Sequence, residues 1–234
     1  MDIVPGVTTD GYADLRPFLG RALPSDLTGR RCLDIGTFDG FWAFAMEDRG
    51  ASAVVGIDVD STEELEHPPL KRANNIALAH ESGVVPGEGF RLAKRIRQSN
   101  AERISCNVYD LSLERIGGTV DFVVVGTILQ HLRDPVKALE RVREVLAPGG
   151  RAVIVETISM PLTIRHPRHP VGEFRAAMPH GRFTWTVANL ALLNSWAAAA
   201  GIPRTGKRPS LYRPKGLRSG DWIAALEIAP DGSL

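Results

Sequence analysis

The stretch CLDIGTFDGFWAF, residues 32–44, decides the fold of this chain. An apolar run reaches an acid, Asp34, and then passes two glycines four residues apart, Gly36 and Gly40, before an aromatic-rich segment. A buried strand followed by a glycine turn and a helix begins many nucleotide-binding folds, although folds without a cofactor use the same turn. The stretch therefore predicts a strand–turn–helix unit, and the rest of the chain must indicate which cofactor the turn holds.

The composition is typical of a globular protein with one sizeable domain. Of the 234 residues, 44% are hydrophobic and 24% are charged, and no apolar run approaches the ~18–20 residues of a membrane-spanning helix. The start MDIVPGVTTDG has no secretory pattern. The only two cysteines, Cys32 and Cys106, lie in apolar strand-like runs, which favours buried free thiols in a reducing compartment. We therefore expect a single cytoplasmic domain over residues 1–234 and no membrane partner.

Charge is distributed unevenly along the chain, although the net charge is only +1. Between residues 157 and 220, ten Lys and Arg residues accompany one acid, Glu173, so this segment carries +9 and the remainder −8. Two explanations stay open: a solvated basic face balanced by an acidic one, or a surface that meets an anionic partner.

Strand and helix patterns alternate through the first two-thirds of the chain. Apolar, β-branched runs predict strands at residues 31–35, 52–59, 103–108, 120–126, 151–157 and 221–229. Helical spacing predicts helices at residues 41–49, 71–80, 90–98, 135–146 and 187–200. This order predicts an α/β fold of the Rossmann-like, doubly wound type: a mostly parallel, seven-stranded sheet with helices on both faces. Ligands of such sheets bind at the carboxyl ends of the strands.

Residues 158–185 are irregular and rich in His, Pro and Arg. We interpret them as a cap inserted after the fifth strand, over the edge where a substrate enters. The N-terminal residues 1–25 are assigned to the substrate side as well, with Tyr12 placed to close over the pocket.

The glycine turn does not fit a dinucleotide site. The fingerprint G-x-G-x-x-G has a second glycine that lets the backbone approach a pyrophosphate, but here that position is Phe38, and Trp42 replaces the third glycine. This makes a nicotinamide-dependent oxidoreductase a distant alternative, and no G-K-[S/T] follows to make a phosphate-binding loop. Asp58, at the end of the next strand, is placed to accept hydrogen bonds from a ribose diol. The turn therefore favours a cofactor with a ribose and no phosphate.

Five segments in order resemble the motifs of the class I S-adenosylmethionine-dependent methyltransferases. They are LDIGTFDG (33–40), GIDVD (56–60), CNVYDL (106–111), DFVVVGTILQHLRDP (121–135) and LAPGGRAVIVE (146–156). GTILQHLRDP, VETIS and residues 182–202 also resemble the subgroup of the tRNA wobble-uridine carboxymethyl-transferring enzyme and its relatives of uncertain substrate. Phe38, in place of a glycine, and Gln130, in place of a tyrosine, depart from this pattern, and favour ordinary S-adenosylmethionine as cofactor.

The resemblance implies a cofactor, S-adenosylmethionine, with S-adenosylhomocysteine as product, and a role for each matching residue. The implied cofactor-binding residues are Asp34, Gly36, Thr37, Phe38, Gly40, Asp58, Val59, Asn107, Val108, Asp110, Gly126 and Thr127. Residues 36–40 would wrap the methionine end, with Asp34 near its ammonium group; Asp58 would bind the ribose, and Asn107 or Asp110 the adenine. The alternatives are structural: Asp34 as an acid that caps the loop amides, Asp58 as a helix cap, and Asp110 as a turn residue.

His131 is the first candidate for chemistry, because it follows the fourth strand, next to where the methyl group is delivered. Its imidazole titrates near neutrality and can take a proton from a hydroxyl or amine. The alternative is a structural histidine, because methyl transfer often needs only a positioned nucleophile. His180 and Tyr12 are further catalytic candidates. Substrate-binding candidates are Arg165, Arg168, Arg175 and Arg182, which we expect to line the cap and meet an anionic group.

No metal site is expected. His166 and His169 lie among prolines, and no carboxylate or cysteine completes a ligand set.

The leading hypothesis is a methyltransferase that moves a methyl group by in-line displacement to an O or N nucleophile of a small molecule, a natural product or an anionic metabolite. One alternative is an enzyme that modifies tRNA or another RNA, suggested by the basic segment and the subgroup. Another is a non-catalytic protein that kept only the cofactor pocket. The motifs specify no oligomeric state.

Overall fold

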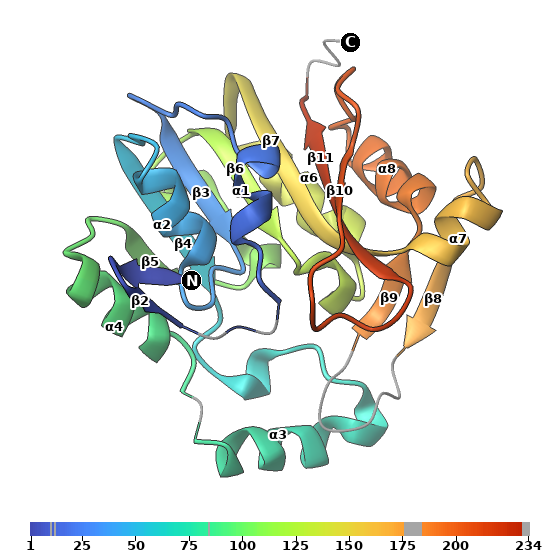
Figure 1. The fold of residues 1–234 in the computed structure, drawn as a ribbon, viewed down its shortest axis with the longest axis horizontal. Coiled ribbons are helices and arrows are strands. Elements are labelled where there is room, and N and C mark those ends of the chain that lie inside the picture. Colours follow the sequence, from blue (N-terminus) through green and yellow to red (C-terminus); the bar gives the residue numbers. More distant parts are fainter. Residues whose placement is uncertain (10, 12, 84, 176–183, 231–234) are drawn as a thin grey trace.

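Figure 1 shows the computed structural model of the chain, which describes residues 1–9, 11, 13–83, 85–175 and 184–230. Within the described residues, seven of the nine strands of the central sheet follow the order β10-β11-β7-β6-β3-β4-β5, and the other two pair beside β7. The five parallel strands are β3 (Arg31–Ile35), β4 (Ala53–Asp58), β5 (Glu102–Ser105), β6 (Val120–Gly126) and β7 (Leu146–Ser159). The antiparallel edge is β11 (Asp221–Ile228) and β10 (Ser210–Tyr212). The prediction of a mostly parallel, Rossmann-like α/β sheet is confirmed.

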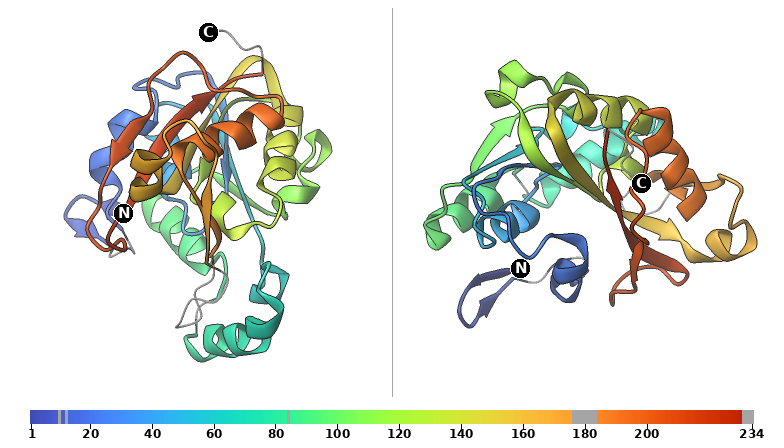
Figure 2. Two further views of the ribbon diagram at one scale, coloured as in Figure 1. Left: turned by 90° about the vertical axis from the view of Figure 1, so that its right-hand side faces the viewer. Right: turned by 90° about the horizontal axis from the view of Figure 1, so that it is seen from above.

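Helices cover both faces of the sheet (Figure 2), because its central strands are apolar on both sides. One face packs against α1 (Leu19–Ala22), α2 (Phe41–Glu47) and α4 (Glu88–Arg97). The other packs against α5 (Leu113–Ile116), α6 (Pro135–Val145) and α8 (Leu190–Ala199). In β3, Cys32 belongs to the first layer and Leu33 and Ile35 to the second, as the two-residue alternation of a strand requires.

Trp42 locks α2 onto the sheet. Its side chain is buried, and a Cβ built on Gly126 would lie 2.6 Å from its ring. The glycine at the end of β6 therefore makes room for Trp42.

The segment between β4 and β5 leaves the sheet. It comprises the short helices η2 (Thr62–Glu64) and η3 (Pro69–Lys71) and the longer α3 (Arg72–Glu81). Figures 1 and 2 show α3 lying beyond the carboxyl ends of the strands, apart from the two helical layers.

The region after β7 is more regular than the sequence predicts. It contains α7 (Met160–Arg165) and a hairpin of β8 (Gly172–Arg175) and β9 (Thr184–Ala188), and β9 also pairs with β7. The helix predicted from residue 187 begins only at Leu190, because the Asn189 Oδ1 accepts the Leu192 amide as an N-cap. The Asn189 Nδ2 also donates to the carbonyl oxygens of His166 and His169, so one side chain ends β9, starts α8 and fixes the His/Pro-rich loop.

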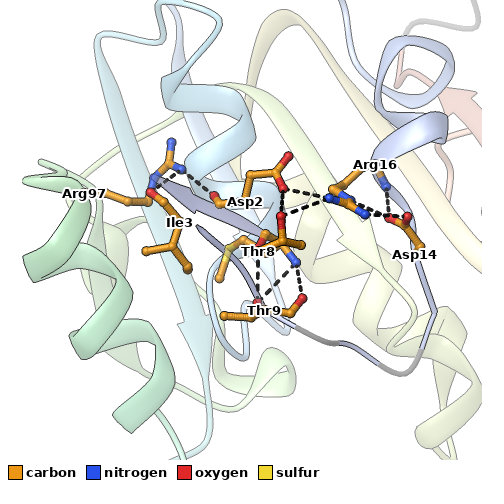
Figure 3. Close-up of polar contacts among 8 residues, drawn as sticks. Asp2, Ile3, Thr8, Thr9, Asp14, Arg16 and Arg97 are labelled. Atoms are coloured by element: carbon orange, nitrogen blue, oxygen red, sulfur yellow. Dashed lines mark hydrogen bonds and ion pairs between the residues drawn. The ribbon is translucent and has the colours of Figure 1, made fainter. Parts of the chain in front are cut away.

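The N-terminal segment is a small hairpin, β1 (Asp2–Val4) and β2 (Val7–Thr8), that is tied to the main body (Figure 3). Arg16 pairs with both Asp2 and Asp14, and the Arg97 guanidinium of α4 donates to the Asp2 carbonyl over 2.8 Å. Within the described residues, no helix combines the length and apolar character needed to cross a membrane.

Candidate active site

A cavity opens at the carboxyl ends of β3, β4, β5 and β6. Six of the residues predicted to bind cofactor or act in catalysis line it: Gly36, Asp58, Val59, Asn107, Val108 and His131. They come from four different strand ends, which parallel pairing brings to the same edge of the sheet.

The residue of the glycine turn that lines the cavity is Gly36, which has no side chain. Gly36 has a φ of +72°, and a Cβ there would lie 3.0 Å from the Cδ1 of Ile128, in the loop after β6. The amides of Gly36 and Thr37 donate to the Ile57 carbonyl over 2.9 and 3.0 Å, which folds the turn back over the end of β4. A glycine is needed at position 36 for both its backbone conformation and its space.

Phe38 lies outside this cavity. It keeps a left-handed φ of +45° because its amide donates to the Asp58 Oδ2 over 2.8 Å. Its side chain is 59% exposed and lines a neighbouring surface groove with Asp39 and Arg91. The role of Phe38 beside the cofactor stays a prediction, since Phe38 lines this groove and is not among the residues that line the cavity.

Asp34 stabilises the turn from behind. It is fully buried, and its Oδ2 accepts the Thr37 hydroxyl over 2.8 Å and the Ala43 amide over 3.1 Å. Burial raises the pKa of its carboxyl to about 7. Thr37 is also buried, packed where a Cβ on Gly56 would be 2.7 Å from its Oγ1. Both side chains are buried, and Asp34 contacts the Thr37 hydroxyl of the turn and an amide of α2, which are structural contacts.

Asp58 is the carboxylate that reaches the cavity. Its Oδ1 accepts the amide of Val59 and its Oδ2 that of Phe38, both over 2.8 Å. Burial raises the pKa of this carboxyl above its ordinary value. Each carboxylate oxygen has a second lone pair, so Asp58 can still accept hydrogen bonds from a diol.

The segment after β5 is shaped by Asn107, whose Oδ1 accepts the Tyr109 amide over 3.0 Å and starts the short helix η4 (Val108–Asp110). This turn presents Asn107 and Val108 to the cavity. Asp110, at the end of η4, does not line it.

His131 ends the short helix η5 (Leu129–His131) in the loop after β6. Glu156, at 1% exposure in β7, supports this helix: its Oε2 accepts the Gln130 amide over 3.3 Å and its Oε1 the Thr157 amide over 2.7 Å. Burial raises the pKa of the Glu156 carboxyl to about 7. Glu156 is not among the residues predicted from the sequence, although an acid inside an apolar strand is a signal of a buried polar contact.

The remaining predicted cofactor residues do not line the cavity. Trp42 packs where a side chain on Gly126 would be, and Thr127, with a φ of +53°, donates its amide to the Val155 carbonyl over 2.6 Å. Gly40 begins α2 and lies against Phe44 and Phe90.

The predicted substrate-binding arginines do not act as a group. Arg175 lies in the cap as predicted, but acids occupy its buried guanidinium, which donates to both carboxylate oxygens of Asp221, over 2.6 and 2.9 Å, and to Glu173 over 2.6 Å. Arg165 and Arg168 are exposed after β7, away from the cavity lining. Tyr12, His180 and Arg182 lie outside the described residues.

One wall of the cavity consists of residues that were not predicted from the sequence. Glu64, Leu65 and Glu66, from the segment after β4, line it together with Ile128 and Leu132. Three acidic residues, Asp58, Glu64 and Glu66, therefore line the cavity, and its described lining residues include no Lys or Arg. This lining suits a ligand with positive charge and apolar surface, and it disfavours a pyrophosphate.

Comparisons with known proteins show which family this chain resembles in sequence. A family model for the methyltransferase domain matches residues 9–213. A tRNA U34 carboxymethyltransferase of Azotobacter vinelandii is 28% identical over 177 residues, which cover 76% of this chain and 46% of the relative. A ubiquinone biosynthesis O-methyltransferase of Pseudomonas aeruginosa is 33% identical over 133 residues, covering 57% and 46% respectively. The chain spans about half the length of the curated relatives it matches.

Solved structures share the fold at low sequence identity. The 1,6-didemethyltoxoflavin-N1-methyltransferase of Burkholderia thailandensis, with bound 1,6-didemethyltoxoflavin and S-adenosylhomocysteine, gives a TM-score of 0.60 at 15% identity over 92% of this chain and 77% of that one. An N-methyltransferase of Bradyrhizobium japonicum in complex with S-adenosylhomocysteine gives 0.55 at 17% identity, over 92% and 87%. Likeness at such identities concerns the fold, whereas the family match covers most of the sequence. This chain belongs to the methyltransferase domain family.

Proposed function

We propose that this protein is an S-adenosylmethionine-dependent methyltransferase that transfers a methyl group by in-line displacement to an O or N nucleophile of a small molecule. The observation that carries the proposal is the cavity at the strand ends, which Asp58 and two further acidic residues line and whose described wall has no Lys or Arg. A cofactor with a ribose and a positive charge fits this set of groups; a dinucleotide does not.

Different residues of the cavity would contact different parts of the cofactor. Asp58 would accept hydrogen bonds from the ribose hydroxyls, and the backbone at Gly36 would meet the methionine end. Asn107 and Val108 would meet the adenine, with Leu65 offering apolar surface. The cofactor supplies a methyl group that is already activated by a sulfonium, so the protein has only to align the acceptor and exclude water.

His131 is proposed as the general base for acceptors that must lose a proton. It lines the cavity at the end of η5, whose amides are held by the buried Glu156. A neutral imidazole can take a proton from a hydroxyl or amine near neutral pH.

A small-molecule acceptor is favoured over RNA because several of the basic residues form ion pairs with acids of the same chain. Arg175, Lys207 and Arg218, three of the ten cations between residues 157 and 220, are paired with acids. The relatives named for ubiquinone biosynthesis and for 1,6-didemethyltoxoflavin act on small molecules, while the relative named for tRNA U34 keeps RNA as the second candidate. Cys32 and Cys106 are buried free thiols, which supports a cytoplasmic location.

The proposal is tested by calorimetric titration with S-adenosylhomocysteine, S-adenosylmethionine and NAD. We expect the first two to bind and NAD not to bind. Asp58→Asn should abolish binding, whereas Asp60→Asn, which removes an exposed carboxylate paired with Arg103, should leave it unchanged. Binding of NAD in preference to S-adenosylhomocysteine, or undiminished binding by Asp58→Asn, would overturn the proposal.

A further inference from the structure

Residues 62–67, the strap, connect the cavity to the cap. Glu64, Leu65 and Glu66 of the strap line the cavity. Figure 1 shows the chain between β4 and α3 crossing below the sheet toward the lower end of β9. The strap contains only one short turn of helix, so its position depends on contacts with other elements.

Glu66 makes the contacts that fix the strap on the side of β6. Its Oε2 accepts the Tyr109 hydroxyl over 2.9 Å and the Arg133 amide over 2.7 Å. Burial raises the pKa of the Tyr109 hydroxyl well above its usual value, so the phenol stays protonated and donates. Glu66 therefore joins the strap to the segment after β5 and to the loop before α6.

The cap contributes the second attachment. The indole N–H of Trp185, in β9, donates to the Glu66 carbonyl over 2.8 Å. The Arg133 guanidinium lies 4.7 Å above the Trp185 ring and also donates to the His67 carbonyl over 3.4 Å. Trp185 and Arg133, which contact each other, thus hold the carbonyl groups of the two neighbouring residues Glu66 and His67.

We propose that Trp185 and Arg133 are positioning residues for the cofactor: the cap strand β9 sets the affinity of the cavity by holding the strap in place. The inference rests on the proposed function, because it takes the cavity as the cofactor site. Neither side chain lines the cavity, so each acts through Glu66 and its neighbours. Since coupling between two parts of a protein is reciprocal, a bound cofactor must in turn stabilise the contact between the strap and β9.

The first test is calorimetric titration of the full chain with S-adenosylhomocysteine. Trp185→Phe keeps the aromatic ring but loses the N–H donor, and Arg133→Met loses the cation above the ring. We expect each to weaken binding about 5- to 30-fold, the loss of one hydrogen bond and one cation–π contact. The matched controls Trp196→Phe, in α8, and Arg143→Met, at an exposed position of α6, should bind as the wild type does.

The melting temperature of each variant separates positioning from general stability. A lower melting temperature with an unchanged Kd in both variants would overturn the inference and leave the proposed function intact. No binding by the wild-type protein would overturn the proposed function, and the inference with it.

A second measurement needs no substitution. Hydrogen exchange of the wild-type protein, followed by mass spectrometry, should slow in both residues 62–67 and residues 184–188 when S-adenosylhomocysteine is added. Protection confined to residues 62–67, with none in β9, would contradict the coupling.

Discussion

At the scale of single residues, the site lies near positions that depart from the expected residue type, such as an acid within an apolar strand or a phenylalanine in place of a glycine. Asp34 is an acid in a buried strand, and it holds the turn through Thr37 and Ala43. Phe38 replaces a glycine and still adopts a left-handed backbone, because Asp58 accepts its amide. Sequence alone predicts that these positions matter. It does not predict which of them faces the ligand, because that depends on contacts made across the turn.

Gly56 is the residue that allows Thr37 to reach Asp34. In Gly56→Ala the new Cβ would lie 2.7–2.9 Å from three atoms of the Thr37 side chain, all buried. We expect a loss of about 1–3 kcal/mol in the free energy of unfolding, measured by urea denaturation. Gly20→Ala is the control, because a Cβ there meets open space in α1 and should be neutral or slightly stabilising. Equal stability of the two variants would contradict this account of the turn.

Glu156 should make stability depend on pH. Burial raises the pKa of its carboxyl from an ordinary value of 4.5 to about 7 in the folded protein. The folded state therefore holds the proton more tightly than the unfolded chain, and stability falls as pH rises from about 4.5 to about 7. Relative to Glu156→Gln, the wild type should lose roughly 2–3 kcal/mol between about pH 5 and pH 8.

Urea denaturation of both proteins at the two pH values measures this difference. Glu114→Gln, at an exposed position, is the control and should track the wild type. A constant difference between the wild type and Glu156→Gln at the two pH values would contradict a raised pKa.

At the scale of elements, the parallel strands and their helices could be predicted, because each has a continuous apolar pattern. The hairpin of β8 and β9 could not, since it pairs with β7 at a single register position and is fixed by side chains distant in sequence. Asn189 ends β9 where periodicity alone continues the helix. The strap was missed for the same reason: its partners, Arg133 and Trp185, follow it by more than sixty residues.

Arg175 and Asp221 join this hairpin to β11. Their side chains are 8% and 7% exposed, and the pairing is bidentate. Removing one partner leaves a buried charge, so Arg175→Met and Asp221→Leu should each lower the free energy of unfolding by about 3–5 kcal/mol. The double variant should be more stable than either single variant, as urea denaturation of all four proteins would show. Additive losses would contradict a desolvated pair.

At the scale of the whole molecule, the charge asymmetry along the sequence is partly neutralised in space. Lys207 and Arg151 both pair with Glu227, and Arg175 pairs with Asp221, an acid beyond the basic segment. Of the two explanations that composition leaves open, these contacts favour a balanced surface. Fold class and the gathering of strand ends follow from the order of elements, whereas charge balance depends on tertiary contacts and could not be predicted.

Methyl transfer to a small molecule is the activity that we propose for this chain. The most direct test incubates the protein with S-adenosylmethionine labelled in its methyl group and an extract of its native cells, then separates small molecules, RNA and protein. We expect the wild-type protein to transfer label to the small-molecule fraction. This label should be absent with Asp58→Asn and present with Asp60→Asn. Label in RNA, or no transfer to any fraction by a protein that binds S-adenosylhomocysteine, would contradict the proposal.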